Sequence, residues 1–435
     1  MNKNMCSSYI QSLSGRTPFV LPRAWEVLHI ADFKEPHADI DIELLLQRAL
    51  EKPIDSPPLN KKIAAGSSIA ILIEDLTRTS PKKYILENLL EVLVAIGIRK
   101  DDISIVVALG THNPLSHREL EDGFGSEIVA RYEFINHDCY AADLVPIGKL
   151  TTGTTVKINR RVYDADYRIG IGSIFPHPMN GFGGGGKILF PGVADFDSTI
   201  EHHLKYSFRG QSRLGNLVDN AFHQEITRMA QAGRLDFIIN SVLDHNDCLF
   251  DLVCGDPVQA HKVGTTICRG IISYPFTRQA DVTIISAFPY TIGPQIMKPL
   301  APAAMITRPG GCIILCADCT SPLPEQYFEA CEKFTTEHQG RLRQAVLSKF
   351  ENNSLIMEGA PPELNMSMAQ LMLALNDYSI ILVTTDIPQK QAERLGLTAV
   401  TNLQKAITIC DEYYSQPTVN VVPSGGVILP VLQAS

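Results

Sequence analysis

The chain has 435 residues and a formal net charge of −9. These values bear on the number of domains and on the kind of partner. This length exceeds the usual size of one hydrophobic core, so it predicts two domains. The acidic balance argues against a nucleic-acid partner, which would need a basic face. Hydrophobic residues make up 45% and charged residues 20%, a composition typical of a globular enzyme.

No targeting or membrane segment is expected from the sequence. The N-terminal residues lack the apolar core of a signal peptide, and no apolar run reaches the length of a membrane span. The ten cysteines are scattered, which is typical of free thiols in a reducing compartment. We therefore expect a cytoplasmic protein that has no membrane partner.

Three cysteines lie close together in CIILCADC, at Cys312, Cys316 and Cys319, as in some iron–sulfur sites. The first of them follows a Gly-Gly turn and begins an apolar run, which predicts a buried strand. In an extended strand, which rises roughly 3.3 Å per residue, the first two cysteines would be about 13 Å apart. The pattern therefore favours core packing over a metal cluster.

Strands and helices alternate in the first half of the chain. The segment Ser67–Asp75 predicts a strand, and residues 80–98 have the apolar spacing of a helix, with Ser80 as N-cap and Pro81 in the first turn. Residues 102–110 and 166–178 predict two more strands that end in polar turns. This order indicates a parallel sheet, whose site is built by the loops at the carboxyl ends of its strands.

A second set of strands begins near residue 280 and continues through residues 310–317 and 377–385, with a helix at 364–376. The fold class is therefore α/β, with two α/β domains and a cofactor and substrate cleft between them. We expect an N-terminal cofactor-binding domain at residues 1–268 and a C-terminal domain at 269–435. The tail after about residue 415 can pack on either domain.

The stretch FPHPMNGFGGGGKILFPG, residues 175–192, fits parts of two nucleotide-binding templates. A dinucleotide fingerprint must open a helix, but Pro191 and Gly192 would break a helix that began at the last glycine. A phosphate loop needs Ser or Thr after its lysine, and this chain has Ile188. We interpret the four glycines as a loop that lets a large group approach Lys187 closely.

Several histidines fall at strand ends or near the glycine loop, namely His112, His177 and the pair His202 and His203. Imidazole is a good ligand for nickel, zinc, copper or iron. Lysine is a poor metal ligand but a good nucleophile and covalent tether. Together these residues indicate a metal or cofactor site.

These motifs resemble those of one known family, the nickel-dependent lactate racemases, whose members carry a nickel-pincer nucleotide. The resemblance covers about residues 66–430. The spacing also agrees, because His177 lies ten residues before Lys187 and His203 lies sixteen residues after it. The matching motifs are Asp75-Leu76-Thr77-Arg78, Gly110-Thr111-His112, Pro176-His177, the glycine loop ending in Lys187, Pro191-Gly192 and His203.

The resemblance implies nickel and a covalent cofactor, pyridinium-3-thioamide-5-thiocarboxylic acid mononucleotide, attached to Lys187 through a thioamide bond. His203 would be the protein ligand to nickel, and cofactor-maturation enzymes would be needed as partners. Gln295 and Lys298 would bind the substrate. The nucleotide would be held by Asp75, Leu76, Thr77, Arg78 and Leu189.

The implied reaction is racemisation or epimerisation of a 2-hydroxy acid. A pyridinium carbon can accept hydride from the substrate while a base takes the hydroxyl proton, and the planar keto acid can receive hydride on either face. Each enantiomer presents its hydroxyl on a different side, so two acid–base groups are needed. His112 and His177 suit this role because histidine titrates near neutral pH.

Some positions differ from the family pattern. Pro294 stands where a tyrosine is common, Gly183 where serine is common, and the single tryptophan is Trp25 rather than one in the second domain. These changes concern substrate recognition, so the substrate can be lactate, another 2-hydroxy acid or a sugar acid. The alternatives are a catalytically idle homologue that binds nickel or nucleotide, and a phosphate-loop kinase or NTPase.

Overall fold

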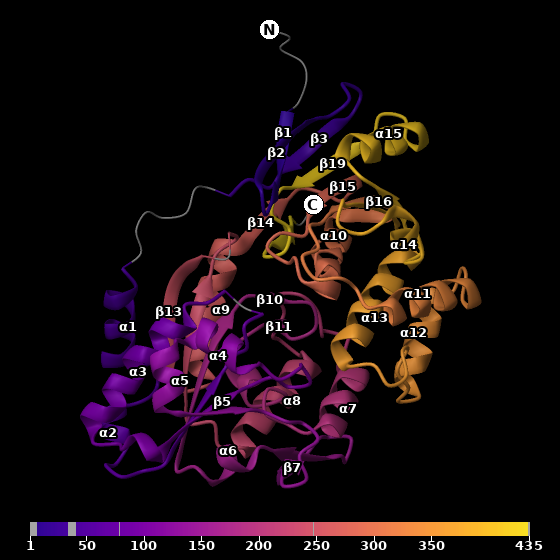
Figure 1. Cartoon of the computed structure of the whole chain (residues 1–435). Coiled ribbons are helices and arrows are strands. Elements are labelled where there is room, and N and C mark those ends of the chain that lie inside the picture. The colour runs from indigo at the N-terminus through magenta and orange to yellow at the C-terminus, as the bar shows by residue number, and fades with distance from the viewer. Residues whose placement is uncertain (1–6, 34–40, 78, 247, 434–435) are drawn as a thin grey trace. The chain divides into compact units, whose positions relative to one another are not determined.

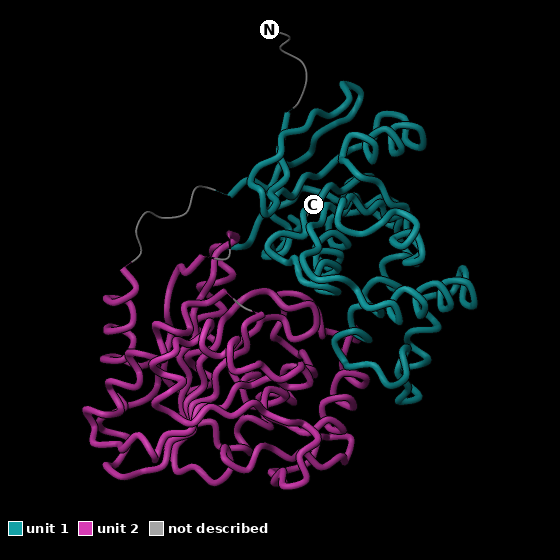
Figure 2. The backbone as a smooth tube through the Cα atoms, viewed as in Figure 1, with its two compact units in different colours: residues 1–35, 272–435 teal, residues 36–271 magenta. Residues whose placement is uncertain are grey.

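The computed structural model describes residues 7–33, 41–77, 79–246 and 248–433, which divide into two compact units (Figure 2). Unit 2 is Pro36–Ile271, and unit 1 combines Met1–Glu35 with Ile272–Ser435. Each unit is built around a six-stranded sheet. The α/β class expected from the sequence is confirmed.

The sheet of unit 2 has the strand order β13-β12-β9-β4-β5-β6, and only β13 runs antiparallel to its neighbour. In Figure 1, α3 lies to one side of this sheet and α8 to the other. The sheet strands are β4 (Ile69–Ile73), β5 (Ile103–Val107), β6 (Glu133–Asn136), β9 (Tyr167–Ile174), β12 (Phe237–Leu243) and β13 (Leu249–Gly255). The short strands are β7 (Val145–Lys149), β8 (Thr155–Ile158), β10 (Pro176–His177) and β11 (Gly181–Phe182).

The α-helices of unit 2 connect these strands and cover the sheet. They are α1 (Ile42–Glu51), α2 (Leu59–Lys62), α3 (Lys82–Ile96), α4 (His117–Phe124), α5 (Ser126–Arg131), α6 (Arg160–Asp164), α7 (Phe196–Tyr206), α8 (Ala221–Ala232) and α9 (Gln259–Ile272). Two 3₁₀ turns are η1 (Lys100–Asp102) and η2 (Gly185–Ile188).

The central strands of unit 2 are apolar on both faces, as parallel strands between helices must be. Every residue of β4 is buried. Ile69, Ile71 and Ile73 belong to the same core as Leu86 and Leu89 of α3. On β9, Gly170 has no side chain, and a Cβ there would lie 2.5 Å from Ile188 of the glycine loop. The glycine loop therefore packs directly on the central strand.

The sheet of unit 1 has six parallel strands in the order β18-β17-β16-β15-β19-β3. They are β3 (Glu26–Ile30), β15 (Ala280–Ser286), β16 (Thr307–Cys316), β17 (Ser379–Val383), β18 (Thr398–Val400) and β19 (Thr418–Val422). Paired outside it are β1 (Ser7–Ser12) with β2 (Gly15–Val20), and β14 (Ser273–Phe276) with β20 (Leu429–Leu432). The helices are η3 (Gly293–Met297), α10 (Leu300–Ile306), α11 (Glu325–Glu337), α12 (Leu342–Glu351), α13 (Pro362–Asp377), α14 (Gln389–Glu393) and α15 (Leu403–Tyr413).

The N-terminal strands group differently from the sequence expectation, which assigned residues 1–268 to one domain. Strand β3 pairs with β19, with Glu26 opposite Thr418 and Val27 opposite Val419. Trp25 lies in the same core as Val421. Residues 7–33 therefore belong to the unit that contains most of the C-terminal half of the chain, and the tail strand β19 lies in that unit's sheet.

Two local predictions have different outcomes. The expected N-cap Ser80 is wrong, because α3 begins after Pro81 and the Ser80 hydroxyl donates a hydrogen bond to Glu74 instead. The prediction that Cys312 and Cys316 lie in a buried strand is confirmed, since both are buried in β16. Cys319, just beyond this strand, is also buried.

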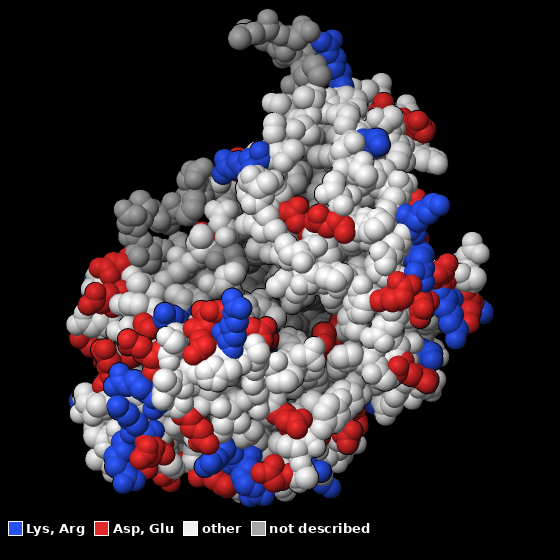
Figure 3. Space-filling view, viewed as in Figure 1, with Lys and Arg blue, Asp and Glu red and all other residues white. Residues whose placement is uncertain are grey.

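The surface carries charges of both signs. On the face shown in Figure 3, Lys and Arg are interspersed with Asp and Glu, and the described residues visible there form no continuous basic stripe. A nucleic-acid backbone is usually followed by such a stripe. Within the described residues, no helix is both long enough and apolar enough to cross a membrane.

Candidate functional site at the strand ends of unit 2

The expected site residues of unit 2 follow three adjacent strands of the parallel sheet. Strand β4 lies between β9 and β5: the chain runs from β4 to β5 and β6 on one side and later returns to β9 on the other. Asp75 follows β4, His112 follows β5 and His177 follows β9. Ligands of open α/β sheets bind at the carboxyl ends of the strands where the strand order reverses. The topology therefore brings these three residues to one edge.

Asp75 and His112 form a direct pair. Nδ1 of His112 lies 2.6 Å from Oδ2 of Asp75, and this carboxylate also accepts hydrogen bonds from the backbone N–H and hydroxyl of Thr77, at 3.0 and 2.5 Å. A carboxylate can only accept, so Nδ1 of His112 donates and the neutral ring carries its lone pair on Nε2. Asp75 thus fixes the orientation and the tautomer of the His112 ring. The neighbouring Arg78 lies outside the described residues.

His177 has the opposite tautomer. It lies in the short β10–β11 hairpin, where its Nδ1 accepts hydrogen bonds from the backbone N–H groups of Met179 and Asn180, at 3.3 and 3.0 Å. A nitrogen that accepts these bonds has no proton, so the neutral ring carries its proton on Nε2. The two histidines at the strand ends are therefore chemically different: His112 presents an acceptor and His177 a donor.

The glycines of this loop lie in close contact with other parts of the protein. A Cβ on Gly183 would lie 2.7 Å from the Phe175 ring, and a Cβ on Gly186 would lie 2.7 Å from Ala230. The sequence interpretation, that the glycines allow a large group to approach Lys187, is thus not needed to explain them. The loop forms a single 3₁₀ turn, η2, and opens no α-helix, as the proline after it predicts.

Lys187 lies within electrostatic reach of several histidines. Burial, together with a smaller effect of the positive charge of Lys187, lowers the pKa of His203 to about 4, although the hydrogen bond to the Thr199 carbonyl opposes this shift. The same two causes, burial first, lower the pKa of His261 to about 4. The charge of Lys187 therefore acts on both rings. The structure thus brings together the expected tether, Lys187, and the expected metal ligand, His203.

The two adjacent histidines of α7 have different surroundings. Nδ1 of His203 donates to the carbonyl of Thr199 at 2.8 Å, so Nε2 carries the lone pair that a metal ligand needs. Nε2 of His202 instead donates to the carbonyl of Phe222 at 3.0 Å, and this ring is fully buried. Burial also lowers the pKa of His202 well below its usual value. His202 therefore has a packing role, and of the two rings only His203 has its Nε2 outside a hydrogen bond to the backbone of the described residues.

The expected substrate residues lie in unit 1, around η3. Nζ of Lys298 donates to Oε1 of Gln295 at 3.0 Å and lies 4.4 Å from the centre of the Tyr290 ring. Helix α13 holds this turn, because Ser367 donates to the carbonyl of Pro294 and Gln370 donates to that of Lys298, both at 2.9 Å. The sequence pattern assigns no role to Tyr290, whose contact with Lys298 appears only in the folded chain.

A metal held by protein ligands alone is not built into the described residues. No group of three or more His, Cys, Asp or Glu side chains is placed to hold a metal ion in this part of the chain. His203 offers one imidazole nitrogen beside a lysine. This donor set fits a metal whose other ligands come from a group attached to that lysine.

Comparison with known proteins decides the family. A family model described as the lactate racemase N-terminal domain matches residues 15–215. The lactate racemase of Lactiplantibacillus plantarum is 31% identical over 286 residues, which are 65% of this chain and 67% of that protein. The chain belongs to the lactate racemase family. Racemases are isomerases, and this sets the enzyme class.

Other relatives extend the match to nearly the whole chain. The lactate racemase of Thermoanaerobacterium thermosaccharolyticum is 26% identical over 393 residues, covering 88% of this chain and 89% of that protein. The solved lactate racemase apoprotein from the same organism superposes with a TM-score of 0.87 at 24% identity, covering 98% and 100% of the two chains. A protein from Thermotoga maritima has the same fold, with a TM-score of 0.64 at 17% identity over 90% of this chain and 98% of that one.

Proposed function

We propose that this enzyme racemises or epimerises a 2-hydroxy acid by hydride transfer, using a nickel-pincer nucleotide attached to Lys187. The observation that carries the proposal is the geometry around Lys187 and His203. The lysine lies within electrostatic reach of an imidazole whose Nε2 is available to a metal. Membership of the lactate racemase family supports the reaction type.

The residues of unit 2 fit this cofactor. Lys187 would form the covalent link, His203 would ligate nickel through Nε2, and Leu189 would lie against the nucleotide just beyond the link. The loop after β4, with Asp75, Leu76, Thr77 and Arg78, would hold the rest of the nucleotide. When bound, the group supplies a carbon that accepts and returns hydride, together with the remaining nickel ligands.

His112 and His177 would handle the hydroxyl proton on opposite faces of the substrate. Nε2 of His112, oriented by Asp75, would accept the proton from one enantiomer. His177 carries its proton on Nε2 in the neutral state and would hydrogen-bond the carbonyl oxygen of the keto acid. To serve as a base, His177 must release the N–H groups of Met179 and Asn180 and move its proton to Nδ1. The proposal therefore includes a rearrangement at β10–β11.

The substrate carboxylate would be bound by unit 1. Lys298 would neutralise its charge and Gln295 would hydrogen-bond it, once their mutual 3.0 Å hydrogen bond is exchanged for the substrate. Because Pro294 stands next to Gln295 where a tyrosine is common in the family, the substrate can be lactate, a larger 2-hydroxy acid or a sugar acid. Maturation enzymes would supply the cofactor.

Isotope exchange tests the mechanism directly. The enzyme, produced together with the maturation enzymes of a lactate racemase, is given one enantiomer of lactate or of a larger 2-hydroxy acid in heavy water. If hydride passes to the cofactor and returns, the inverted product keeps most of its original hydrogen at the reacting carbon. Rapid deuterium incorporation at that carbon would exclude the hydride mechanism.

Intact mass and nickel content of the same preparation provide the control. A mass increase that maps to Lys187, with bound nickel but without turnover of any acid tested, would identify a binding protein that has lost activity. Turnover without any adduct on Lys187 would contradict the proposed cofactor.

A further inference from the structure

Two buried side chains grip the backbone of the glycine loop from different elements. Asn240 lies in β12, and its Oδ1 accepts a hydrogen bond from the N–H of Gly185 at 2.8 Å. His261 lies in α9, and its Nε2 donates to the carbonyl of Gly183 at 2.8 Å. They are 1% and 3% exposed, so each lost bond would leave a buried backbone group unpaired.

The fit of the loop to these side chains is close. A Cβ on Gly184 would lie 2.9 Å from Oδ1 of Asn240, and a Cβ on Gly185 would lie 2.7 Å from the His261 ring. Gly184 and Gly185 have φ values of 76° and 60°, which favour glycine. The backbone conformation just before Lys187 is therefore set by contacts to β12 and α9, and not by the loop's own hydrogen bonds alone.

The surroundings fix the amide orientation of Asn240 and the charge of His261. Nδ2 of Asn240 donates to the carbonyl of Ile239 at 3.1 Å, so Oδ1 faces the loop. His261 stays neutral near pH 7 because its burial and the charge of Lys187 keep its pKa at about 4. A neutral ring that donates from Nε2 is a stable donor for Gly183 throughout the pH range of most enzymes.

We propose that Asn240 and His261 are positioning residues that hold Lys187 in the direction needed for attachment of the nucleotide. This inference rests on the proposed function, because it concerns how the tether is presented. Neither residue contacts the reacting atoms; both act through the backbone of residues 183–185. Such preorganisation lowers the entropic cost of bringing the lysine to its partner.

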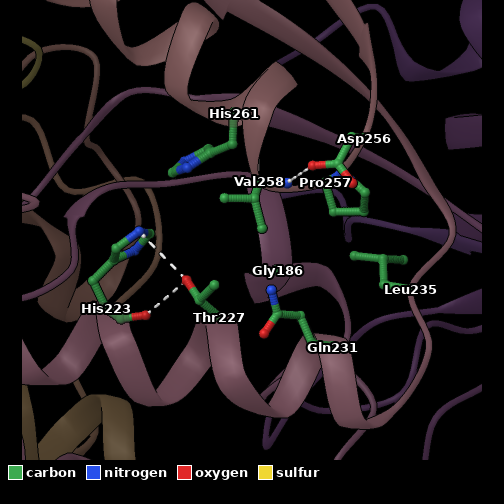
Figure 4. Close-up of a pocket in the computed structure, with 10 residues that line it drawn as sticks. Gly186, His223, Thr227, Gln231, Leu235, Asp256, Pro257, Val258 and His261 are labelled. Atoms are coloured by element: carbon green, nitrogen blue, oxygen red, sulfur yellow. Dashed lines mark hydrogen bonds between the residues drawn. The ribbon is translucent and has the colours of Figure 1, made fainter. Parts of the chain in front are cut away.

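A pocket beside His261 makes the inference testable by substitution. The pocket has a volume of about 70 Å³ and is lined by Gly186, His223, Thr227 and His261 among others (Figure 4). It gives a larger ring at position 261 room to be accommodated. His261→Phe removes the donor, whereas His261→Gln places an amide N–H near the position of Nε2 and can restore the bond to Gly183.

The main measurement is hydrogen exchange in the cofactor-free protein, followed by intact mass after production with the maturation enzymes. We expect Asn240→Ala and His261→Phe to speed amide exchange in residues 183–187 about tenfold and to lower the fraction of Lys187 adduct about tenfold, as loss of a buried hydrogen bond predicts. His261→Gln should recover most of both values. Strand β9 should keep its slow exchange.

Asn365→Ala is the matched control. Asn365 is 0% exposed and binds the backbone of Met357 and Ala360 in unit 1, far along the chain from the tether. It should destabilise the protein yet leave Lys187 loading normal. Equal loss of loading in Asn365→Ala, or normal loop exchange and loading in both His261→Phe and Asn240→Ala, would overturn the inference.

Different results would contradict the proposed function and the positioning role of Asn240 and His261. If the unmodified protein takes up no adduct after production with the maturation enzymes, the proposed function is wrong. If it takes up the adduct but the His261→Phe and His261→Gln variants load alike, only the positioning role is wrong. The comparison of His261→Phe with His261→Gln tests the positioning role even if Asn240→Ala does not fold.

Discussion

At the scale of single residues, Asp75 controls the tautomer of His112. Replacing it by Asn removes the carboxylate, and the new amide can donate to Nδ1 and so leave the lone pair on the wrong nitrogen. We expect Asp75→Asn to lower kcat by about two to four orders of magnitude, as in other enzymes whose base is oriented by a carboxylate. The measurement is kcat for each enantiomer, with the tautomer read by nitrogen NMR.

The control for this variant is Asp166→Asn. Asp166 also accepts hydrogen bonds from a backbone N–H and a hydroxyl, both of Ser68, but contacts no histidine among the described residues. The activity of the Asp166→Asn variant should stay close to that of the unmodified enzyme. If Asp75→Asn retained full activity, the pairing with His112 would have no catalytic role.

Lys187 is expected to be essential for loading and dispensable for folding. Lys187→Ala should lose the whole adduct mass and all activity, while the melting temperature of the cofactor-free protein changes little. The comparison is Lys262→Ala, an exposed lysine on α9 of the same unit, which should load and turn over normally. An active Lys187→Ala variant would contradict the covalent tether.

The neighbouring histidines of α7 should separate metal binding from packing. His203→Ala removes the available Nε2, so bound nickel should fall about tenfold or more with little loss of stability. His202→Ala removes a fully buried ring and its bond to Phe222, and should lower the free energy of unfolding by about 2–4 kcal/mol while a folded fraction still binds nickel. The reverse pattern would make His202 the ligand.

At the scale of elements, the glycine loop should tolerate no side chain at Gly184. Its φ of 76° and the near contacts of a Cβ with Ile174 and Asn240 predict that Gly184→Ala lowers the free energy of unfolding by about 2–4 kcal/mol. Gly270→Ala in α9 meets nothing within 4 Å and should instead stabilise by roughly 0.5–1 kcal/mol. Urea denaturation measures both.

The sequence was sufficient where structure depends on local pattern. The strands β4, β5 and β16 were predicted because each contains a short run of apolar residues, and β9 because its three isoleucines precede a polar turn. Helix α13 was predicted because its apolar residues recur with helical spacing. The candidate residues Asp75, His112 and His177 were placed correctly at strand ends, since that placement follows from the order of strands and helices alone.

Long-range contacts account for what the sequence did not show. The pairing of β3 with β19 joins residues almost 400 positions apart, and no local pattern marks it. Ser80 has the usual residue type of an N-cap, but its hydroxyl binds Glu74. The roles of Asn240 and His261 depend on β12 and α9 meeting the glycine loop, so only the folded chain reveals them.

At the scale of the whole molecule, the titratable histidines are distributed unevenly. Burial lowers the pKa of His203, His223 and His261 to about 4, and also lowers that of His202 and His137. All five belong to unit 2. In unit 1, burial lowers the pKa of His29. The two units should therefore respond differently to acid.

The sign of the effect follows from proton binding. Between about pH 6.5 and pH 4, the unfolded chain protonates His203, His223 and His261 while the folded unit 2 does not. The unfolded state then binds more protons, so the free energy of unfolding falls as the pH falls. Each histidine contributes a slope of up to about 1.4 kcal/mol per pH unit in this window. Their stabilisation is complete above about pH 6.5 and is lost as the pH falls to about 4.

The single tryptophan makes this prediction measurable. Trp25 is 6% exposed in the core of unit 1, where its Nε1 donates to Asp411 at 2.7 Å, so its fluorescence reports the unfolding of that unit alone. Far-UV circular dichroism reports both units. In an acid titration, we expect helical signal to be lost first while the Trp25 emission stays that of a buried ring. His223→Phe, which removes one of the titrating groups, should shift the first transition to lower pH. Coincident transitions at every pH would show that the buried histidines do not set the acid stability of unit 2.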